Sequence, residues 1–246
     1  MVVFLGELLG TMLMMLLGNG VVMNVLLEES KGKNSGWIVS TAAWGFAVMV
    51  AVYSVEWMSG AHLNPAVTLA LSLIGKSPWP LLPFYFEGQL IGAMIGTTLA
   101  WIVYFPHFQK TKNQHHKLLC FCTAPAIRSF FWNFMTEVIA TSILVLGFLG
   151  IFDTHNQIVQ WAKPCLIGAL VVGIGLSLGG PTGFAINPAR DLGPRILHYI
   201  LPISGKGSSD WKYCWIPIFG PFAGGMIGAF AYDVLFDFVK NLNVNL

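Results

Sequence analysis

Long apolar runs, separated by short polar or turn-rich stretches, dominate the chain. A helix needs about 20 apolar residues to cross the roughly 30 Å hydrocarbon core of a bilayer. Six runs are long enough, at residues 2–27, 37–59, 81–105, 129–152, 163–181 and 213–238. Two further apolar stretches, 64–74 and 187–201, are too short to span. We expect them to be re-entrant half-helices, with the irregular backbone before them buried in protein or lining an aqueous cavity.

The second half of the chain repeats the pattern of the first. Each half has a glutamate in its first span, Glu7 or Glu137, and glycines spaced by four in its third span: Gly88, Gly92, Gly96 and Gly220, Gly224, Gly228. That spacing puts the glycines on one helix face, where they allow close packing. Three spans per half make the second copy enter from the opposite side. We therefore expect one membrane domain, 1–246, with inverted repeats at about 1–105 and 129–246 joined by a loop at 106–128.

The tripeptide Asn-Pro-Ala opens both short stretches, at residues 64–66 and 187–189. Asparagine is a favoured helix N-cap, and proline is favoured at the first helical position. Each copy therefore predicts a helix that begins inside the membrane and presents free N–H groups and a positive dipole end. The donors at such an end orient a passing hydroxyl or water oxygen and repel cations, so Asn64 and Asn187 are candidate pore donors.

Composition confirms the membrane setting and excludes other classes. Hydrophobic residues make up 55% of the chain and charged residues only 10%, against about 25% charged in soluble domains. The net charge of +2 gives no reason to expect a nucleic-acid partner. We find no nucleophile–base arrangement, phosphate loop or metal-ligand set, so neither an enzyme nor a cofactor is expected. Cys120 and Cys122, with His115 and His116 nearby, are not expected to bind metal.

The segments around both tripeptides resemble the major intrinsic protein family, the aquaporins and glycerol facilitators. Residues 59–68 (SGAHLNPAVT) and 183–194 (GFAINPARDLGP) are highly specific, and the likeness runs from residues 7–11 (ELLGT) to the last glycine-rich span. It implies an all-α membrane protein with six tilted helices and two half-helices meeting at mid-membrane. It also implies one pore per subunit, a homotetramer, and a multi-pass location in the plasma membrane.

The resemblance gives roles to residues around the half-helices. The extended segments before the two tripeptides, residues 60–63 and 183–186, are called the lead-ins below. They would line the pore with carbonyl acceptors from Gly60, Ala61, His62, Gly183, Phe184 and Ala185. The narrowest ring would be formed by Trp44, Gly175, Phe184 and Arg190. The lead-ins would be supported by Glu7 and Glu137. Asp191 and Arg195, four residues apart, are expected to pair on the helix surface and shape the outer loop.

The ring favours glycerol over water as the solute. Water-selective members are expected to carry histidine where this chain has Gly175, so the ring is wider here. Trp44 and Phe184 then form an apolar corner that faces the donors of Arg190. Glycerol has one hydrocarbon edge and one row of hydroxyls, and both are matched by such a ring. Asp191, directly after the arginine, is typical of the glycerol branch.

Other functions stay open at this point. Within the family, the main solute could be water, urea, dihydroxyacetone or protonated lactic acid. An ion-coupled secondary transporter also has inverted repeats and broken helices, but it needs a titratable cluster in the pore, and only Glu7 and Glu137 qualify. Glu56 and Glu87 are unusual for glycerol facilitators. If both face the inner mouth they make it acidic, and otherwise each lies near the head groups or bonds to a neighbour.

The loop charges conflict with the expected orientation. With the N-terminus in the cytoplasm, the outer loops hold Lys31, Lys33, Lys110, Lys112, Lys117, Arg128, Lys206 and Lys212. The inner side holds only Lys76, Lys163 and Lys240. The excess of positive charge in cytoplasmic loops would favour the reverse orientation.

Overall fold

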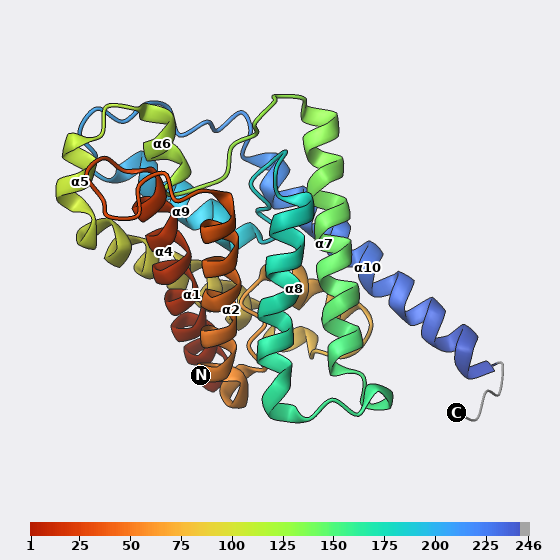
Figure 1. Ribbon diagram of the computed structural model, residues 1–246. Coiled ribbons are helices and arrows are strands. Elements are labelled where there is room, and N and C mark those ends of the chain that lie inside the picture. Colours follow the sequence, from red (N-terminus) through yellow and green to blue (C-terminus); the bar gives the residue numbers. More distant parts are fainter. Residues whose placement is uncertain (242–246) are drawn as a thin grey trace.

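Six long helices form the body of the protein (Figure 1). The computed structural model describes residues 1–241, so the last five residues of the predicted domain lie outside it. The long helices are α1 (Val2–Leu26), α2 (Trp37–Ser59), α4 (Leu82–Val103), α7 (Phe130–Phe152), α8 (Lys163–Leu178) and α10 (Trp215–Asn241). Each coincides with one predicted span. The six helical segments, counted with the 3₁₀ turns that directly precede α4 and α8, are apolar and long enough to cross a membrane. The prediction of six spans is confirmed.

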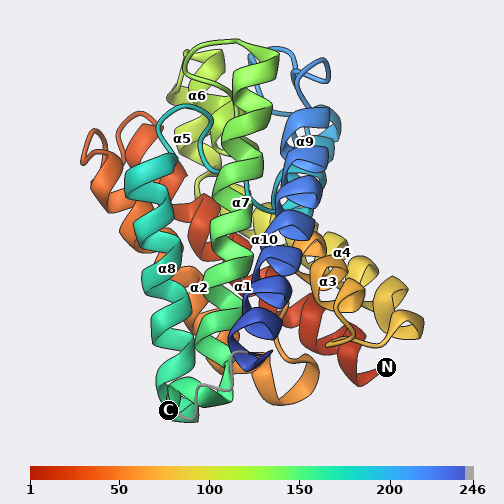
Figure 2. The same cartoon turned by 90° about the vertical axis from the view of Figure 1, so that its right-hand side faces the viewer.

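The two short apolar stretches form the half-helices α3 (Pro65–Leu73) and α9 (Pro188–Ile200). Each packs against the last span of the other half: α3 lies against α10, and α9 lies against α4. In Figure 2, α9 lies in the upper half of the molecule and α3 in the lower half. We call the end that carries the N-terminus and α3 the inner end, and the opposite end the outer end.

The glycines at four-residue spacing are points of close helix contact. A Cβ atom at Gly92 of α4 would lie 2.4 Å from the carbonyl oxygen of Leu8 in α1. A Cβ atom at Gly224 of α10 would lie 2.2 Å from the carbonyl oxygen of Val138 in α7. Both distances are too short for a side chain, so the two helix pairs pack backbone to backbone. This contact is the same in the two halves of the chain.

The connection between the halves is more ordered than the predicted loop at 106–128. It contains two short helices, α5 (Phe105–Lys110) and α6 (Gln114–Leu119), which cover the outer end (Figure 1). Phe108 and Phe121 are buried there and pack on each other with ring centres 5.8 Å apart. The polar sequence concealed this small apolar core, which explains the difference from the prediction.

Three single 3₁₀ turns complete the described helices: η1 (Trp79–Leu81), η2 (Thr154–Asn156) and η3 (Gln160–Ala162). The first leads into α4, and the other two lie in the inner connection between α7 and α8. These turns shape the inner end, where the N-terminus also lies (Figure 1).

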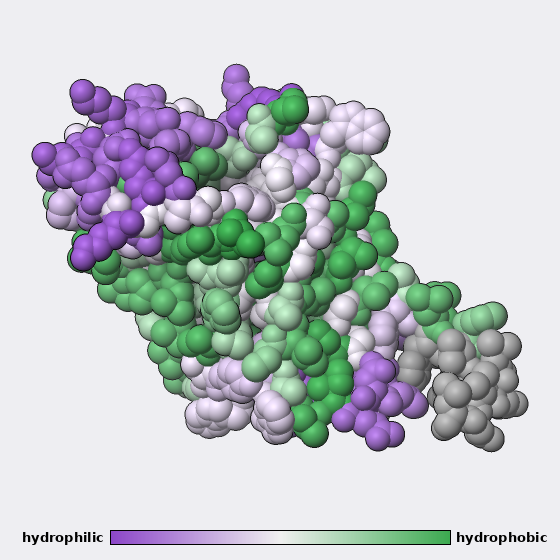
Figure 3. All heavy atoms as spheres, viewed as in Figure 1, coloured by the Kyte–Doolittle hydropathy of each residue, from purple (hydrophilic) through white to green (hydrophobic). Residues whose placement is uncertain are grey.

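The surface has a broad apolar band between a polar outer end and smaller polar patches at the inner end (Figure 3). The band includes exposed side chains such as Phe46 on α2, Ile139 on α7 and Phe230 on α10. An apolar band of this kind is what lipid tails or a neighbouring subunit would cover. The molecule therefore has the surface of a membrane-spanning protein.

Several cations at the outer end have partners inside the protein. The Lys206 ammonium donates to the carbonyls of His198, Tyr199 and Leu201 at 2.6–2.7 Å and so caps the end of α9. Lys117, which is buried, donates to the carbonyl of Ser204. Simple counting of loop charges ignores such contacts, which give these lysines a structural role. The membrane orientation itself stays a prediction.

Candidate pore and selectivity site

The two asparagines of the repeated tripeptide meet at the centre of the molecule. The side-chain oxygen of Asn64 accepts from the backbone N–H of Ala66, and that of Asn187 accepts from Ala189 and Arg190, so both cap their helices. Each side-chain NH2 group crosses to the other lead-in. Asn64 Nδ2 donates to the carbonyl of Ile186, and Asn187 Nδ2 donates to the carbonyl of Leu63, both at 2.7 Å. One N–H of each amide remains for another acceptor.

The backbone of both lead-ins is forced into unusual conformations. Gly60 and Gly183 have φ values of +80° and +85°. Ala61, Leu63, Phe184 and Ile186 also have positive φ, between +39° and +54°. Such values cost non-glycine residues energy and persist only where the surroundings enforce them. The same pattern occurs in both lead-ins, and it keeps the preceding stretch from continuing as helix.

Glu7 holds the first lead-in in place. This buried carboxylate on α1 accepts from the backbone N–H of His62 at 3.0 Å and of Leu63 at 2.7 Å. Ser59 Oγ and Gln89 Nε2 donate to it as well, at 2.6 and 2.7 Å. Four donors around one carboxylate offset the desolvation of a buried charge. The structure thus places Glu7 against the first lead-in.

Glu137 holds the second lead-in in the corresponding way. It lies on α7 and accepts from the backbone N–H of Ala185 at 3.0 Å and of Ile186 at 2.8 Å. Thr182 Oγ1 donates the third hydrogen bond, at 2.7 Å. Ser59 and Thr182 are therefore equivalent partners, one before each lead-in. Sequence reasoning did not single them out, although each directly precedes a lead-in glycine.

The first lead-in has extra support from α4. The Tyr85 hydroxyl donates to the carbonyl of Ser59 at 2.7 Å, and its ring stacks on His62 with centres 4.2 Å apart. His62 Nδ1 lies 3.2 Å from Thr68 Oγ1, which also accepts from Gln89 Nε2. These contacts fix the orientation of the His62 ring. Gln89 and Tyr85 could not have been found from sequence, because their contacts depend on how α4 crosses α1.

The four residues of the predicted ring lie together. The Arg190 guanidinium, which is 6% exposed, lies over the indole of Trp44 with Cζ 4.3 Å from the ring centre. Trp44 itself lies against Gly18, where a Cβ atom would be 2.4 Å from the indole. A Cβ atom at Gly175 would lie 2.9 Å from Cζ of Phe184. The phenyl ring of Phe184 therefore covers Gly175, and any side chain at position 175 would displace that ring.

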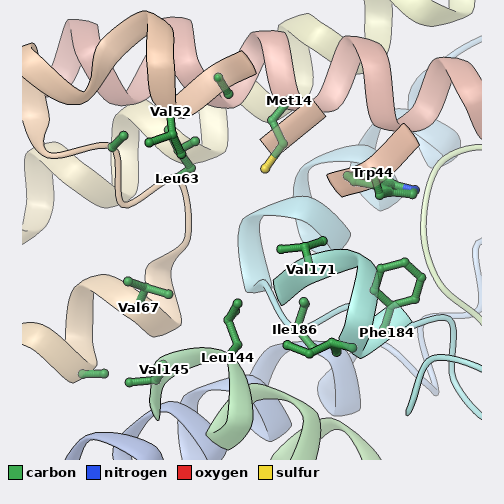
Figure 4. Packing of buried hydrophobic residues seen from close by; sticks show 14 of the residues in the cluster. Met14, Trp44, Val52, Leu63, Val67, Leu144, Val145, Val171, Phe184 and Ile186 are labelled. Atoms are coloured by element: carbon green, nitrogen blue, oxygen red, sulfur yellow. The ribbon is translucent and has the colours of Figure 1, made fainter. Parts of the chain in front are cut away.

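Two cavities adjoin this ring. The central cavity, of about 70 Å³, reaches past both asparagines, and the outer cavity, of about 440 Å³, opens toward α6. Trp44, Phe184 and Arg190 line both cavities, so they lie at the boundary between them. Figure 4 shows Trp44 and Phe184 at one end of the apolar cluster that surrounds the central cavity, near Val171 and Ile186.

The wall of the central cavity is mostly apolar, with a few polar side chains. His62, Asn64, Asn187 and Arg190 bring its polar atoms, and the remaining wall is mostly aliphatic side chains, including Val52 of α2 and Leu144 of α7 (Figure 4). Nη1 of Arg190 has no hydrogen-bond partner among the described residues. A buried guanidinium N–H without a protein partner is suited to a solute or water oxygen.

Asp191 and Arg195 differ from the expected surface pair, because both side chains are completely buried. Arg195 Nε donates to Asp191 at 2.8 Å, and its other nitrogens donate to the carbonyls of Thr123, Ser209 and Asp210. Asp191 also accepts from the backbone N–H and hydroxyl of Thr123. The outer connections fold over the pair, which sequence spacing alone does not reveal. The pair ties two outer segments to α9.

Neither unusual glutamate lines the two cavities described above. Glu87 is exposed on the outside of α4. Glu56, near the end of α2, accepts from Gln160 Nε2 of η3. Neither cavity is the inner mouth, so an acidic inner mouth stays a prediction. For Glu56, the alternative of a bond to a neighbour is what the structure shows.

The described residues contain no group of three or more histidine, cysteine or acidic side chains that could hold a metal ion. Cys120 and Cys122 are buried free cysteines.

Six spanning helices around two half-helices, with cavities on both sides of a buried arginine–aromatic ring, define a membrane channel. The family model described as "Major intrinsic protein" matches residues 2–232, and the chain belongs to this family of non-enzymatic, multi-pass membrane channels.

Individual relatives agree with this assignment. The chain is 53% identical over 236 residues to the "Probable glycerol uptake facilitator protein" of Thermotoga maritima, covering 96% of this chain and 100% of the relative. It is 49% identical to the "Glycerol uptake facilitator protein" of Bacillus subtilis, covering 96% and 85%. The aquaglyceroporin structure from Plasmodium falciparum superposes with a TM-score of 0.89 at 33% identity, covering 98% of both chains.

Proposed function

We propose that the chain is a passive channel that lets glycerol and other small neutral solutes, together with water, cross the plasma membrane while ions and protons are excluded. The observation that carries this proposal is the ring between the two cavities. There the Arg190 guanidinium lies over the Trp44 indole, Phe184 lines the same boundary between the cavities, and Gly175 adds no side chain. The names of the two bacterial relatives, both glycerol uptake facilitators, support the same solute.

The ring matches the two sides of a glycerol molecule. Its carbon edge can rest on Trp44 and Phe184, while two neighbouring hydroxyls accept hydrogen bonds from the fork of Arg190 donors. Water gains little from an aromatic wall, because it has no apolar side to bury. A three-carbon polyol replaces its lost hydration with arginine donors and loses apolar exposure at the same step.

Beyond the ring, the proposed path follows the two lead-ins. The carbonyls of Gly60, Ala61, His62, Gly183, Phe184 and Ala185 would accept from the solute in turn. The remaining N–H of Asn64 and of Asn187 would donate to a hydroxyl oxygen at the centre. The carbonyls of Leu63 and Ile186 are already used by these asparagines, so they are not part of the row.

Ions are excluded by the same groups. The N-terminal ends of α3 and α9 meet at the centre, and their dipoles point positive charge at the pore. Arg190 adds a full positive charge at the ring. A cation would have to give up its hydration in this positive field, and an anion would meet the carbonyl rows and the aliphatic wall.

Uptake of labelled solutes into vesicles that contain the purified chain tests the mechanism. Glycerol uptake should rise in proportion to concentration up to high concentrations and should not respond to an imposed pH gradient. Saturation at low concentration, or accumulation driven by the gradient, would favour an ion-coupled transporter and overturn the proposal. Parallel uptake of urea, dihydroxyacetone and lactic acid ranks the other candidate solutes.

We further propose that four copies assemble, each with its own pore. The family resemblance supports a tetramer, and large apolar side chains on neighbouring faces of α2 and α8, including Phe46, Leu166 and Leu176, are available to a second copy. Native mass spectrometry from a mild detergent is expected to give a mass of four chains. A single-chain mass that persists across several mild detergents would contradict the assembly.

A further inference from the structure

Trp37 lies directly above the proposed ring. It is the first residue of α2, two helical turns before Trp44, and it lines the outer cavity with 44% of its surface exposed. No motif in the sequence marks it. Residues seven apart lie on the same side of a helix, so both tryptophans of α2 face the proposed solute path.

Trp37 is tied to two members of the ring. Its indole N–H donates to the backbone carbonyl of Gly175 at 3.0 Å. Its ring meets that of Phe184 edge to face, with centres 5.7 Å apart and an interplanar angle of 81°. An aromatic pair in this geometry attracts beyond simple burial. Trp37 therefore contacts Phe184 from the outer side while it is anchored to α8.

The glycines of α8 make this contact possible. A Cβ atom at Gly179, one turn after Gly175, would lie 2.5 Å from Phe184 and 2.9 Å from Trp37. Gly175 and Gly179 thus leave a flat strip on α8 that both aromatic rings cover. The backbone of Phe184, at φ +39°, is strained, so its ring depends on these neighbours for its position.

We infer that Trp37 is a further specificity-determining residue of this channel. It acts by positioning Phe184 against α8, and it extends the apolar wall of Trp44 and Phe184 into the outer cavity. The solute it favours is the three-carbon polyol glycerol, whose carbon edge slides along this wall while its hydroxyls face Arg190. The inference deepens the proposed function and rests on it.

Loss of Trp37 would leave Phe184 free to swing toward the outer cavity. The ring of four residues would then widen and lose its apolar edge, so larger solutes such as the four-carbon polyol erythritol would gain relative to glycerol. A role in folding alone would lower all fluxes together, because fewer intact channels would be present. The ratio of two permeabilities in one preparation separates the two cases.

The experiment measures erythritol, glycerol and water permeability in vesicles that contain the parent, Trp37→Ala or Trp37→Phe. The erythritol-to-glycerol ratio should rise about three- to tenfold in Trp37→Ala, the size expected for loss of one aromatic contact. Trp37→Phe keeps an aromatic ring but loses the donor, so it should give a smaller rise. Trp57→Ala is the matched control, since Trp57 is 80% exposed at the inner end of the same helix.

A double-mutant cycle shows whether Trp37 acts through Phe184. In a Phe184→Ala background, Trp37→Ala should change the ratio much less than it does in the parent. An unchanged ratio in both Trp37 variants, or an equal loss of all three permeabilities, overturns the inference. Absence of glycerol flux in the parent would instead contradict the proposed function, so the two failures are distinguishable.

Discussion

Gln89 on α4 donates a 2.7 Å hydrogen bond to the buried carboxylate of Glu7 on α1, and the second half of the chain cannot form its equivalent. Gln89 follows Gly88, and the residue that follows the matching Gly220 is Pro221, which has no side-chain donor. The carboxylate that holds the first lead-in therefore has four donors, whereas that of the second has three. Both lead-ins are held by a buried glutamate, but the glutamate of the first half accepts more hydrogen bonds than that of the second.

Replacing Gln89 by leucine should destabilise the channel without changing which solutes it passes. Glu7 would lose one of its four donors in a buried site, a loss that costs about 1–3 kcal/mol. Thermal unfolding in detergent should occur at lower temperature, and the glycerol-to-water flux ratio should stay constant. Glu87→Gln, two residues away and exposed, is the control and should change stability by less than about 0.5 kcal/mol. A changed flux ratio in Gln89→Leu would contradict a purely supporting role.

Replacing Arg195 by alanine should be among the most damaging single changes in the protein. It would leave the fully buried Asp191 without its charged partner, which costs about 3–5 kcal/mol. It would also remove the donors to Thr123, Ser209 and Asp210. The measurement is the yield and melting temperature of the purified protein. The partly exposed pair of Lys33 and Glu28 gives the comparison: Lys33→Ala should cost less than about 1 kcal/mol. Equal effects would mean that burial of the Asp191–Arg195 pair is unimportant.

Replacing Gly175 by histidine should reduce glycerol flux far more than water flux. The new Cβ atom would lie 2.9 Å from Cζ of Phe184, so the phenyl ring must move and the ring of four residues must narrow. Water, which is smaller and does not use the apolar corner, should be affected less. Glycerol and water permeability are measured on the same vesicles. Combining the change with Phe184→Ala makes room for the imidazole and guards against misfolding. Losses of equal size for both solutes would argue against the assigned ring.

Replacing Arg190 by valine, the residue that follows the first Asn-Pro-Ala, should let some cations leak through. The change removes the full positive charge from the ring but keeps a side chain that already fits after the other tripeptide. Conductance across a planar bilayer, absent in the parent, is the readout. Arg128→Ala, at the exposed outer end, serves as the control and should remain silent. A silent Arg190→Val channel that still conducts glycerol would show that the helix ends alone exclude cations.

The spans and half-helices could be predicted because local rules decide them. An apolar run of sufficient length must be helical in a membrane, and Asn-Pro specifies a helix start wherever it lies. The division into two inverted repeats follows from the same pattern and stays a prediction. Pro106 and Asn113 were available signals for the missed helices α5 and α6, since each lies at a helix N-terminus in the structure.

The parts that the sequence could not supply depend on contacts between distant elements. Three examples are the donor to Glu7 from α4, the burial of Arg195 beneath the outer connections, and the contact of Trp37 with Phe184. They join residues 14 to 147 positions apart. No periodicity marks such pairs. The predicted ring, by contrast, came from family resemblance. In the structure Trp44, Phe184 and Arg190 line both cavities, and Gly175 lies against Phe184.

The central claim is that glycerol passes through this protein. The most direct test follows vesicles that contain the purified chain after a sudden rise in external glycerol, by light scattering, with protein-free vesicles alongside. We predict rapid shrinkage followed by re-swelling much faster than in the protein-free vesicles, and no proton or sodium current. Re-swelling no faster than in protein-free vesicles would contradict the claim.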